Sequence, residues 1–280
     1  KNSHIGLAPA STQKIITSVT AFELLGSDYR YQTKFIYRAD LINKNEIQLS
    51  IFPSGDPTFG SWRWQFTSTE TILNAVINHL EKLREGRCNT ISIQPQWDSE
   101  RTPDGWIWQD IGNYYGAGAE FLNWRENQYD LILKSGSKVG DSVEIVKTNP
   151  FLYHLGITSR ATAGPKGSGD NAYIYLPSIF SDYYVRGTIP VDETQFKISG
   201  AMKNPASQFL ATLKDSLKRR SMWTLSTSKS NTSRVVDKST FYVHFSPSLD
   251  SIIYWFNKKS INLYGEALIK TFAYEKHGFG

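Results

Sequence analysis

A serine and a lysine three positions apart, Ser11 and Lys14, offer the clearest chemistry in this chain of 280 residues. They open an apolar run in which Ile15, Val19 and Phe22 recur at helical spacing. On a helix, residues i and i+3 share one face, so the hydroxyl and the amine can meet. A lysine in a buried first turn becomes less basic and can accept the serine proton, while free N–H groups at the helix start can stabilise an oxyanion. The pattern predicts Ser11 as an acylated nucleophile and Lys14 as its base.

Ser11 and Lys14 also have a structural interpretation, in which the serine caps the helix and the lysine lies on the surface. The same Ser-x-x-Lys spacing occurs at 135–138 and 226–229, in Gly- or Ser-rich loops with no helix behind them. Only the first pair opens an apolar helix, which we expect to end at Gly26. On spacing alone, both interpretations stay open.

A second candidate motif is Ser260-Ile261-Asn262, the only Ser-x-Asn in the chain. It lies between two expected helices. In an acyl-transfer site with a Ser/Lys pair, a second hydroxyl can relay a proton and an amide can bind a substrate carbonyl. The alternative is that Ser260 merely caps a helix.

The bulk properties fit a folded protein with several domains or a large insertion. The sequence is 40% hydrophobic and 14% aromatic, which is enough to build cores. The net charge of +5 suits an anionic polymer, but the basic residues are scattered, and we interpret the densest cluster, Lys218-Arg219-Arg220, as a solvated helix face. Cys88 is the only cysteine, which excludes an intrachain disulfide. The sequence has no apolar run of transmembrane length and no signal peptide. It opens only a few residues before a motif, so we expect a mature or trimmed chain.

Other chemistries have little support in the sequence. The 5 histidines are scattered, without HExxH or cysteine partners, so we expect no metal and no cofactor. The Gly-rich loop at 164–170 lacks the pattern of a phosphate loop, and we expect no nucleic-acid partner. A Ser-His-Asp triad stays open, although no G-x-S-x-G elbow occurs.

Hydrophobic periodicity predicts helices at the two ends of the chain and a β-rich middle. We expect helices over residues 11–26, 69–83, 205–217, 248–256 and 263–274. We expect strands over residues 29–37, 46–52, 88–93, 129–133, 143–146, 172–175, 183–185 and 240–245. A turn is expected at 55–60 and a polar loop at 226–233.

Residues 97–128 combine aromatic side chains with glycine and asparagine, which indicates an irregular packed core or a binding surface. The aromatic residues are Trp97, Trp106, Trp108, Tyr114, Tyr115, Phe121 and Trp124. Asp110 and Asn113 lie among them, and polar groups in such surroundings must be satisfied. We therefore expect Asp110 to be either a structural anchor or a ligand contact.

Four segments, taken together and in order, resemble one known family. They are APASTQK at residues 8–14, GDPTF at 55–59, WIWQDIGNYYGAGA at 106–119 and KSINLYGE at 259–266. The family is that of the D-alanyl-D-alanine carboxypeptidases/endopeptidases, the class C low-molecular-mass penicillin-binding proteins or S13 peptidases. The order and separation of the segments match over nearly the whole chain.

The resemblance implies an α/β (α+β) penicillin-binding, transpeptidase-like and β-lactamase-like domain, with β-rich domains inserted between the first two active-site motifs. Residues 1–32 and 239–280 would form this catalytic domain, without its C-terminal part. Residues 33–128 and 196–238 would form an inserted domain, and 129–195 an innermost β-rich domain. A location in the periplasm or cell envelope is also implied.

The resemblance further implies roles for individual residues. Ser11 would attack the carbonyl of the penultimate D-Ala of a peptidoglycan stem peptide, with Lys14 as its base, and β-lactam antibiotics would acylate the same hydroxyl. Ser260 and Asn262 would complete the catalytic site. Asp110 would contact the free amine of a diaminopimelate side chain, and Tyr115 would lie in the same pocket. The oligomeric state stays open.

One part of the family pattern has no counterpart here, because no Lys-Thr-Gly follows the Ser-x-Asn motif. Lys134-Ser135-Gly136 precedes Ser260 and is in the wrong order. We expect the third motif, with a second oxyanion donor, beyond Gly280. Losing one such donor raises the activation free energy by about 2.7–4 kcal/mol in hydrolases, so the residues as written would be a poor enzyme.

Two other functions stay open, a non-catalytic peptidoglycan-binding relative and a serine β-lactamase. Large insertions suit a polymeric substrate better than a small drug.

Overall fold

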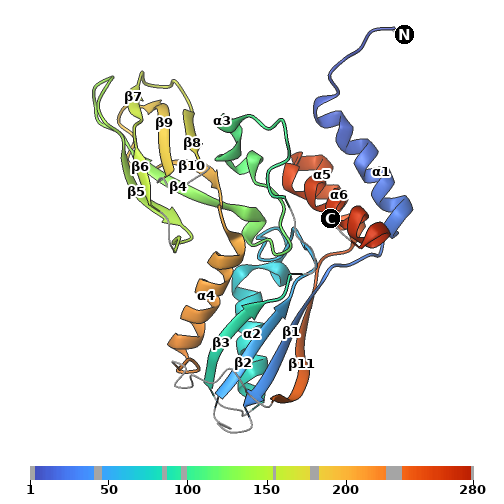
Figure 1. The fold of residues 1–280 in the computed structure, drawn as a ribbon. Helices are drawn as coiled ribbons and strands as arrows, with labels where there is room; N and C mark the ends of the chain where they lie inside the picture. The colour runs from blue at the N-terminus through green and yellow to red at the C-terminus, as the bar shows by residue number, and fades with distance from the viewer. Residues whose placement is uncertain are drawn as a thin grey trace.

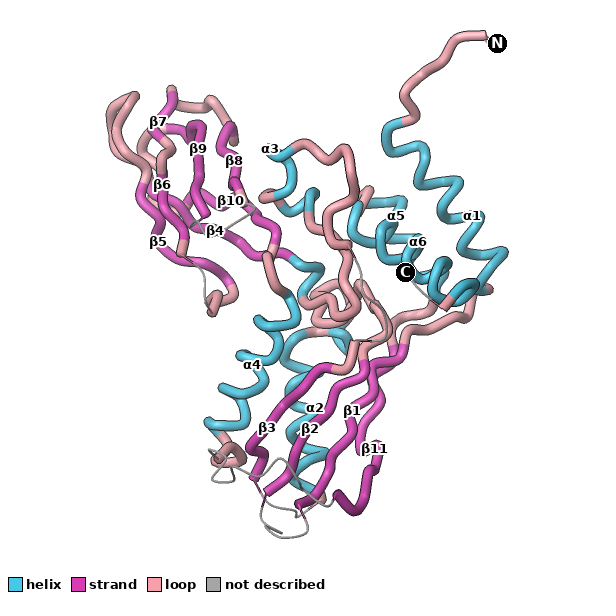
Figure 2. The backbone as a smooth tube through the Cα atoms, viewed as in Figure 1, coloured by secondary structure: helices cyan, strands magenta, loops and turns pink. Residues whose placement is uncertain are grey.

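The computed structural model describes residues 4–40, 46–83, 87–95, 100–153, 156–176, 183–224 and 235–278. Its elements form three groups (Figure 1). Helices from the two ends of the chain lie together, a four-stranded sheet with two helices lies below them, and a small β-rich part lies on the opposite side. Figure 2 shows that loops and short helices fill the space where the three groups meet.

The helical group brings the two chain ends together. α1 (Gln13–Leu25) packs against α5 (Leu249–Lys259) and α6 (Asn262–His277). The helices approach closely because the contact face of α1 carries two small buried residues, Ser18 and Ala21. The core of this group is built mainly from α5 and α6 and includes Leu249, Ile252, Phe256, Leu263, Tyr264 and Leu268.

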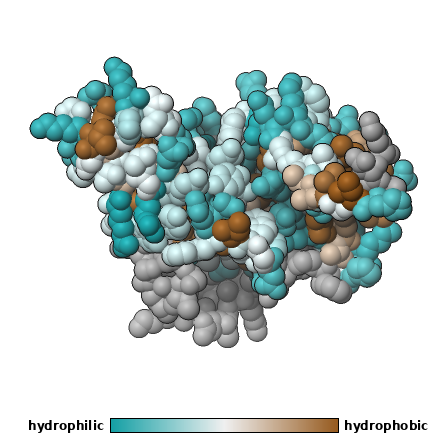
Figure 3. Space-filling view, turned by 90° about the horizontal axis from the view of Figure 1, so that it is seen from above, coloured by the Kyte–Doolittle hydropathy of each residue, from teal (hydrophilic) through white to brown (hydrophobic). Residues whose placement is uncertain are grey.

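The apolar run of α1 lies on the opposite face from this contact. Ile15, Ile16 and Val19 are 61%, 69% and 56% exposed. Seen from above in Figure 3, hydrophobic surface gathers at the end of the molecule that carries α1. The periodicity that predicts the helix therefore marks a face that the described part of the chain leaves uncovered, and small residues make the helix contact instead.

The four-stranded sheet has the order β11-β1-β2-β3. Its strands are β1 (Gln32–Asp40), β2 (Glu46–Phe52), β3 (Arg87–Ile93) and β11 (Val235–Phe245). β2 and β3 are parallel and are joined through α2 (Thr69–Lys82), as a parallel pair requires, whereas β1 pairs antiparallel with both of its neighbours. α2 and α4 (Pro205–Arg219) contact each other, and their apolar faces share one core with the sheet.

The β-rich part consists of two small sheets. The first is antiparallel, in the order β10-β4-β5, and contains β4 (Gln128–Lys134), β5 (Glu144–Asn149) and β10 (Phe196–Ala201). In the second, β9 is central and pairs with the other three strands; it contains β6 (Ile157–Ser159), β7 (Thr162–Gly164), β8 (Asn171–Tyr175) and β9 (Tyr183–Pro190).

A stretch of short helical turns connects the three groups. It contains α3 (Trp108–Ile111), η3 (Tyr114–Gly116) and η4 (Arg125–Asn127), while η2 (Gln65–Thr67) precedes α2. A Cβ on Gly112 would come within 1.8 Å of the Ile174 carbonyl oxygen, so only glycine permits this close approach of α3 to β8. The stretch is thereby fixed to the β-rich part.

Most of the elements expected from periodicity are confirmed, with ends that shift by a few residues. β1 begins at Gln32 rather than Tyr29, β5 occupies 144–149 rather than 143–146, and β11 begins at Val235 rather than Thr240. The Lys218-Arg219-Arg220 cluster is exposed at the end of α4, as interpreted. β6, β7 and β10 are not predicted; β6 and β7 have only three residues each, and all three strands gain their stability from neighbouring strands. Trp97 and the whole of the expected polar loop at 226–233, with the Ser-x-x-Lys pair inside it, lie outside the described residues.

The carboxylate of Glu126 is buried where the helical group meets the rest of the chain. It accepts hydrogen bonds from Ser61 Oγ at 2.7 Å, Arg63 Nε at 2.7 Å and Tyr264 OH at 2.9 Å. Arg63 Nη2 donates to the second carboxylate oxygen at 3.0 Å, which makes the ion pair bidentate. The donors come from two widely separated parts of the sequence, so this carboxylate ties α6 to the loop before α2.

The backbone that carries Glu126 is held in a conformation that L-residues rarely adopt. Arg125, Glu126 and Asn127 have φ values of 55°, 53° and 51°. Three consecutive left-handed residues cost roughly 1–2 kcal/mol each. The buried side chain of Asn127 compensates by accepting from the Trp124 N–H at 2.9 Å and donating to the Gly118 carbonyl at 2.9 Å.

We predict that Glu126→Gln lowers the free energy of unfolding by about 3–5 kcal/mol, because it leaves the mostly buried Arg63 without its anion. Glu81→Gln is the matched control, since it breaks the ion pair with Arg220, in which both side chains are exposed, and we expect it to cost less than about 1 kcal/mol. Urea unfolding of the two variants and the wild type measures both values. Equal effects of the two substitutions would contradict the role assigned to Glu126.

Candidate active site

Ser11 lies in the turn η1 (Ala10–Thr12) that leads into α1. Lys14 follows one turn later, and its Nζ donates to Ser11 Oγ at 3.3 Å. No side chain caps either helix start, which argues against the capping interpretation of Ser11. Lys14 is partly buried, and this burial lowers the pKa of its amine, so that a neutral lysine able to accept a proton forms more readily.

Ser260 comes from the other end of the chain and meets Ser11 directly. Its Oγ donates to Ser11 Oγ at 2.8 Å, across 249 positions of sequence. Ser260 ends α5 in a left-handed conformation, with φ 54° and ψ 44°. Its side chain makes no capping hydrogen bond to α6, which begins after Ile261. The hydroxyl therefore lies in the candidate site, at the cost of a strained backbone.

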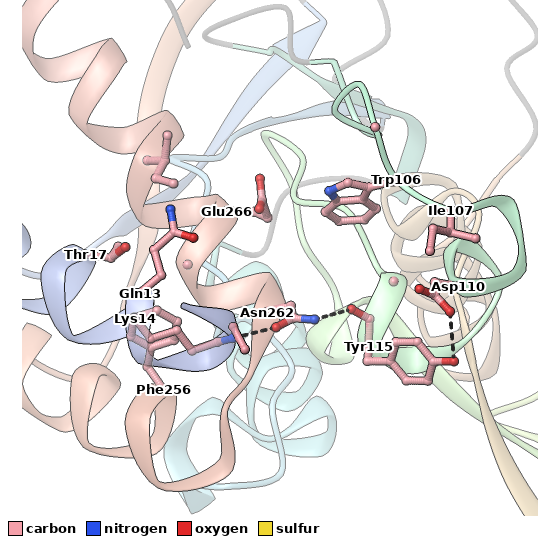
Figure 4. A pocket seen from close by; sticks show the side chains of 15 residues that line it. Gln13, Lys14, Thr17, Trp106, Ile107, Asp110, Tyr115, Phe256, Asn262 and Glu266 are labelled. Carbon is pink, nitrogen blue, oxygen red and sulfur yellow. Dashed lines mark hydrogen bonds between the residues drawn. The ribbon is translucent and has the colours of Figure 1, made fainter. Parts of the chain in front are cut away.

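Asn262 is the first residue of α6 and links Lys14 to the stretch of short helical turns that holds α3, η3 and η4. We call this stretch the connecting stretch. Its Oδ1 accepts from Lys14 Nζ at 2.8 Å, and its Nδ2 donates to the Tyr115 carbonyl at 2.8 Å (Figure 4). These two bonds fix the position of the lysine amine. One amide hydrogen of Asn262 is left for another acceptor, because an asparagine side chain carries two donors.

Asp110 and Tyr115 form the wall opposite α1. The Tyr115 hydroxyl donates to Asp110 Oδ1 at 3.3 Å, as Figure 4 also shows. Burial, and then the negative charge of Asp110, raise the pKa of Tyr115 to about 12, so the phenol is a donor at neutral pH. All six residues expected from the sequence thus lie on one continuous hydrogen-bonded path, in the order Ser260, Ser11, Lys14, Asn262, Tyr115 and Asp110.

A cavity of about 370 Å³ lies between α1, α6 and the connecting stretch. Lys14, Asn262, Asp110 and Tyr115 line it, whereas Ser11 and Ser260 are exposed and lie beyond Lys14, outside its lining. Figure 4 shows Trp106 and Ile107 facing this space from one side and Gln13 and Thr17 from the other. The cavity can hold a side chain or a short peptide next to the serine pair.

Glu266 is a lining residue that the sequence analysis does not identify. It lies one turn after Asn262 on α6 and faces the same cavity. Burial raises the pKa of this carboxyl group, while Lys270 and Lys14 act in the opposite direction. In return, the charge of Glu266 opposes the loss of basicity that burial causes in Lys14. The spacing of four residues from Asn262 on an expected helix is the signal that could have identified it.

The other described serine of a Ser-x-x-Lys pair has a structural role. Ser135 is buried, donates to the Pro190 carbonyl at 2.6 Å and accepts from the Glu193 N–H at 3.0 Å. Within the described ranges, no group of three or more His, Cys, Asp or Glu residues is arranged to hold a metal ion. In the same ranges, none of the helices combines the length and apolarity needed to cross a membrane.

Comparison with known proteins gives one family and a set of similar structures. The model of the D-Ala-D-Ala carboxypeptidase 3 (S13) family matches residues 1–279. A protein of Actinomadura sp. (strain R39), D-alanyl-D-alanine carboxypeptidase, is 24% identical over 294 residues. The match covers 98% of this chain and 51% of that protein, so the chain spans about half the length of this relative.

Two crystal structures of penicillin binding protein 4 (dacB) from Haemophilus influenzae are similar in fold. The first has a TM-score of 0.73 at 19% identity and covers 97% of this chain and 58% of that one. The second, complexed with a novel β-lactam, has a TM-score of 0.64 at 18% identity and covers 96% and 56%. The fold class expected from the sequence is therefore confirmed. Because the family model matches almost every residue, the chain belongs to the D-Ala-D-Ala carboxypeptidase 3 (S13) family.

Proposed function

We propose that the protein is a serine D-alanyl-D-alanine carboxypeptidase/endopeptidase that cleaves peptidoglycan stem peptides through an acyl-enzyme on Ser11. The main support is the hydrogen-bonded arrangement in which Ser11 Oγ lies 2.8 Å from Ser260 Oγ and 3.3 Å from Lys14 Nζ. A nucleophile with a base and a second hydroxyl within reach is what acyl transfer needs. Family membership supports the same reaction.

In this proposal, neutral Lys14 takes the proton of Ser11 as Ser11 Oγ attacks the carbonyl carbon of the penultimate D-Ala. The C–N bond to the terminal D-Ala then breaks, and the proton held by Lys14 passes through Ser260 to the leaving amine, which leaves Lys14 neutral again. The free amide hydrogen of Asn262 binds the substrate carbonyl. Water, deprotonated by the same base, hydrolyses the ester and restores the Ser11 hydroxyl. A β-lactam enters the same path by opening its ring on Ser11.

Asp110 and Tyr115 are proposed to recognise the substrate rather than to react with it. The carboxylate of Asp110 would bind the free amine of a diaminopimelate side chain, with the Tyr115 hydroxyl orienting the carboxylate.

The proposed division of the chain places both residues in an inserted domain (33–128 and 196–238). The catalytic domain would comprise 1–32 and 239–280, and an innermost domain would comprise 129–195. β11 crosses the proposed boundary at 239, because it pairs with β1 along most of its length. We further infer a periplasmic or cell-envelope location, where peptidoglycan is found.

The first prediction of the proposed function concerns the nucleophile. We expect a fluorescent penicillin to form a covalent adduct on Ser11 of the full-length protein, and Ser11→Ala to abolish labelling. Mass spectrometry of the labelled peptide identifies the site. Ser226→Ala is the matched control, because it alters another Ser-x-x-Lys pair, and it should label like the wild type. The absence of any adduct would favour a non-catalytic binding protein, and rapid release of hydrolysed drug would favour a β-lactamase.

The second prediction separates recognition from acylation. Asp110→Asn should lower kcat/KM on a diaminopimelate-containing stem peptide by about 10- to 100-fold, the effect expected from losing one charge-assisted hydrogen bond. The rate of penicillin acylation should stay close to that of the wild type, since the drug carries no such amine. Steady-state kinetics and stopped-flow acylation measure the two quantities. Equal losses in both would show that Asp110 is a structural anchor.

The third prediction concerns the pH dependence of acylation. Glu266→Gln removes a negative charge that raises the pKa of Lys14, so neutral Lys14 should persist to lower pH. We therefore expect the acidic limb of the rate profile to move to lower pH, with the maximal rate retained. Glu23→Gln, an exposed change on α1, is the matched control and should leave the profile in place. A shift to higher pH, or none, would contradict the electrostatic role of Glu266.

A further inference from the structure

The outer face of the sheet formed by β6, β9 and β8 carries aromatic and cationic side chains in register. Tyr184 on β9 lies between Thr158 on β6 and Tyr175 on β8. In the next row, Arg186 of β9 lies beside Tyr173 of β8. Because side chains alternate along a strand, the adjacent residues Ala172, Ile174 and Val185 are buried on the other face. We call Tyr173, Tyr175, Tyr184, Arg160 and Arg186 the Tyr-Arg face.

Side chains of the Tyr-Arg face contact one another in a row. The rings of Tyr175 and Tyr184 stack with their centroids 5.1 Å apart and an angle of 10° between their planes. The guanidinium of Arg160 lies 4.3 Å from the centroid of Tyr184, and that of Arg186 lies 5.9 Å from the centroid of Tyr175. Both arginines are exposed, and neither forms a salt bridge with a carboxylate of the described residues. Among the described residues, the face therefore offers two cations that lie beside aromatic rings and have no salt-bridge partner.

Trp108 extends this row toward the catalytic cavity. Its ring lies edge-on to Tyr175 at 5.2 Å, and its Nε1 donates to the Leu176 carbonyl at 2.9 Å. The side chain is nevertheless 52% exposed. Its neighbour Ile107 lines the cavity next to Asp110. The aromatic row on the sheet and the wall of the cavity are thus neighbours, joined by Ile107 and Trp108.

The side chain of Asn113 joins the segment that carries α3 to β8. Asn113 is buried, accepts from the Ile174 N–H at 3.1 Å and donates to the Gln109 carbonyl at 2.7 Å. Ile174 lies between Tyr173 and Tyr175, so the strand that carries the tyrosines also positions the segment that carries Asp110. After burial and Asp110, the nearby phenol of Tyr173 also contributes to the raised pKa of Tyr115.

We propose that the Tyr-Arg face binds the glycan strand to which the stem peptide is attached, while the peptide occupies the catalytic cavity. The proposal rests on the proposed function, which assigns a stem peptide to that cavity. An amino-sugar chain presents C–H groups, hydroxyls and acetamido groups, which suit aromatic side chains with a polar tip and the fork of donors on arginine. Two sites on one polymer raise its overall affinity through effective concentration. Stacked tyrosines with arginines also suit single-stranded nucleic acid, but continuity with a peptide site favours the glycan.

Binding to a peptide-free sugar polymer tests the face without involving catalysis. The probe is a hexamer of β-1,4-linked N-acetylglucosamine, titrated into the full-length protein by calorimetry. We expect the wild type to bind and both Arg160→Ala and Tyr184→Ala to raise Kd at least about tenfold, which is the scale of one lost polar or aromatic contact. Lys166→Ala, an exposed charge change in the turn after β7, is the matched control and should bind like the wild type. No binding by the wild type, or equal Kd values in all variants, would overturn the proposal.

Kinetics distinguish this proposal from the proposed function. On uncrosslinked glycan strands that carry pentapeptide stems, Arg160→Ala should raise KM about tenfold, with kcat unchanged. On the free pentapeptide, and in penicillin acylation, the variant should equal the wild type. A wild type that hydrolyses neither substrate would refute the proposed function, and the hexamer titration would still decide the role of the face. Tighter binding of oligodeoxythymidylate than of the hexamer would overturn the glycan assignment in favour of a nucleic-acid site.

Discussion

The buried carboxylate of Glu126 is the interaction on which the relative position of the chain's parts depends. A charge without access to water is tolerated only when donors surround it, and here Ser61, Arg63 and Tyr264 supply them. Two of these donors precede α2 and the third lies on α6, so the carboxylate is satisfied in only one arrangement of the helical group on the sheet. Tyr264 is two residues beyond Asn262 on the same helix. The constraint that satisfies the charge therefore also sets where the amide of Asn262 meets Lys14 and the Tyr115 carbonyl.

Within the helical group, polar contacts rather than apolar burial position Ser11 and Lys14. Ser18 Oγ donates to the Lys14 carbonyl at 2.7 Å and accepts from Asn257 Nδ2 at 2.9 Å, which joins α1 to α5 one turn beyond Lys14. The strained conformation of Ser260 ends α5 so that its hydroxyl turns back to Ser11 instead of continuing the helix. Small residues at the interface allow this close approach. The same geometry leaves the larger apolar residues of α1 on the outside.

The sequence is sufficient to predict what depends on local pattern or on residue type. The helix behind Ser11, the Ser260–Asn262 motif between two helices and the aromatic stretch around Asp110 all follow from spacing, and four ordered segments indicate the family. The sequence is not sufficient to predict features that depend on residues far away in the chain. In the sequence, Glu266 and Glu126 are indistinguishable from ordinary helix or loop carboxylates, because only folding buries them. The left-handed conformation of residues 125–127 is also not predictable, since none of the three is a glycine. The face of α1 that packs is likewise decided by α5 and α6, not by its own periodicity.

The path of hydrogen bonds from Ser260 to Asp110 crosses a boundary between two kinds of structure. Its first four members stand on helices from the chain ends, whereas Tyr115 and Asp110 stand on short turns fixed to the β-rich part through Asn113 and Gly112. The only bond on the path that joins the two is the one from Asn262 Nδ2 to the Tyr115 carbonyl. The acceptor of this bond is a backbone oxygen, so a change of the Tyr115 side chain leaves the acceptor in place. In the proposed function, this arrangement separates the groups suited to acyl transfer from the wall that would contact the peptide.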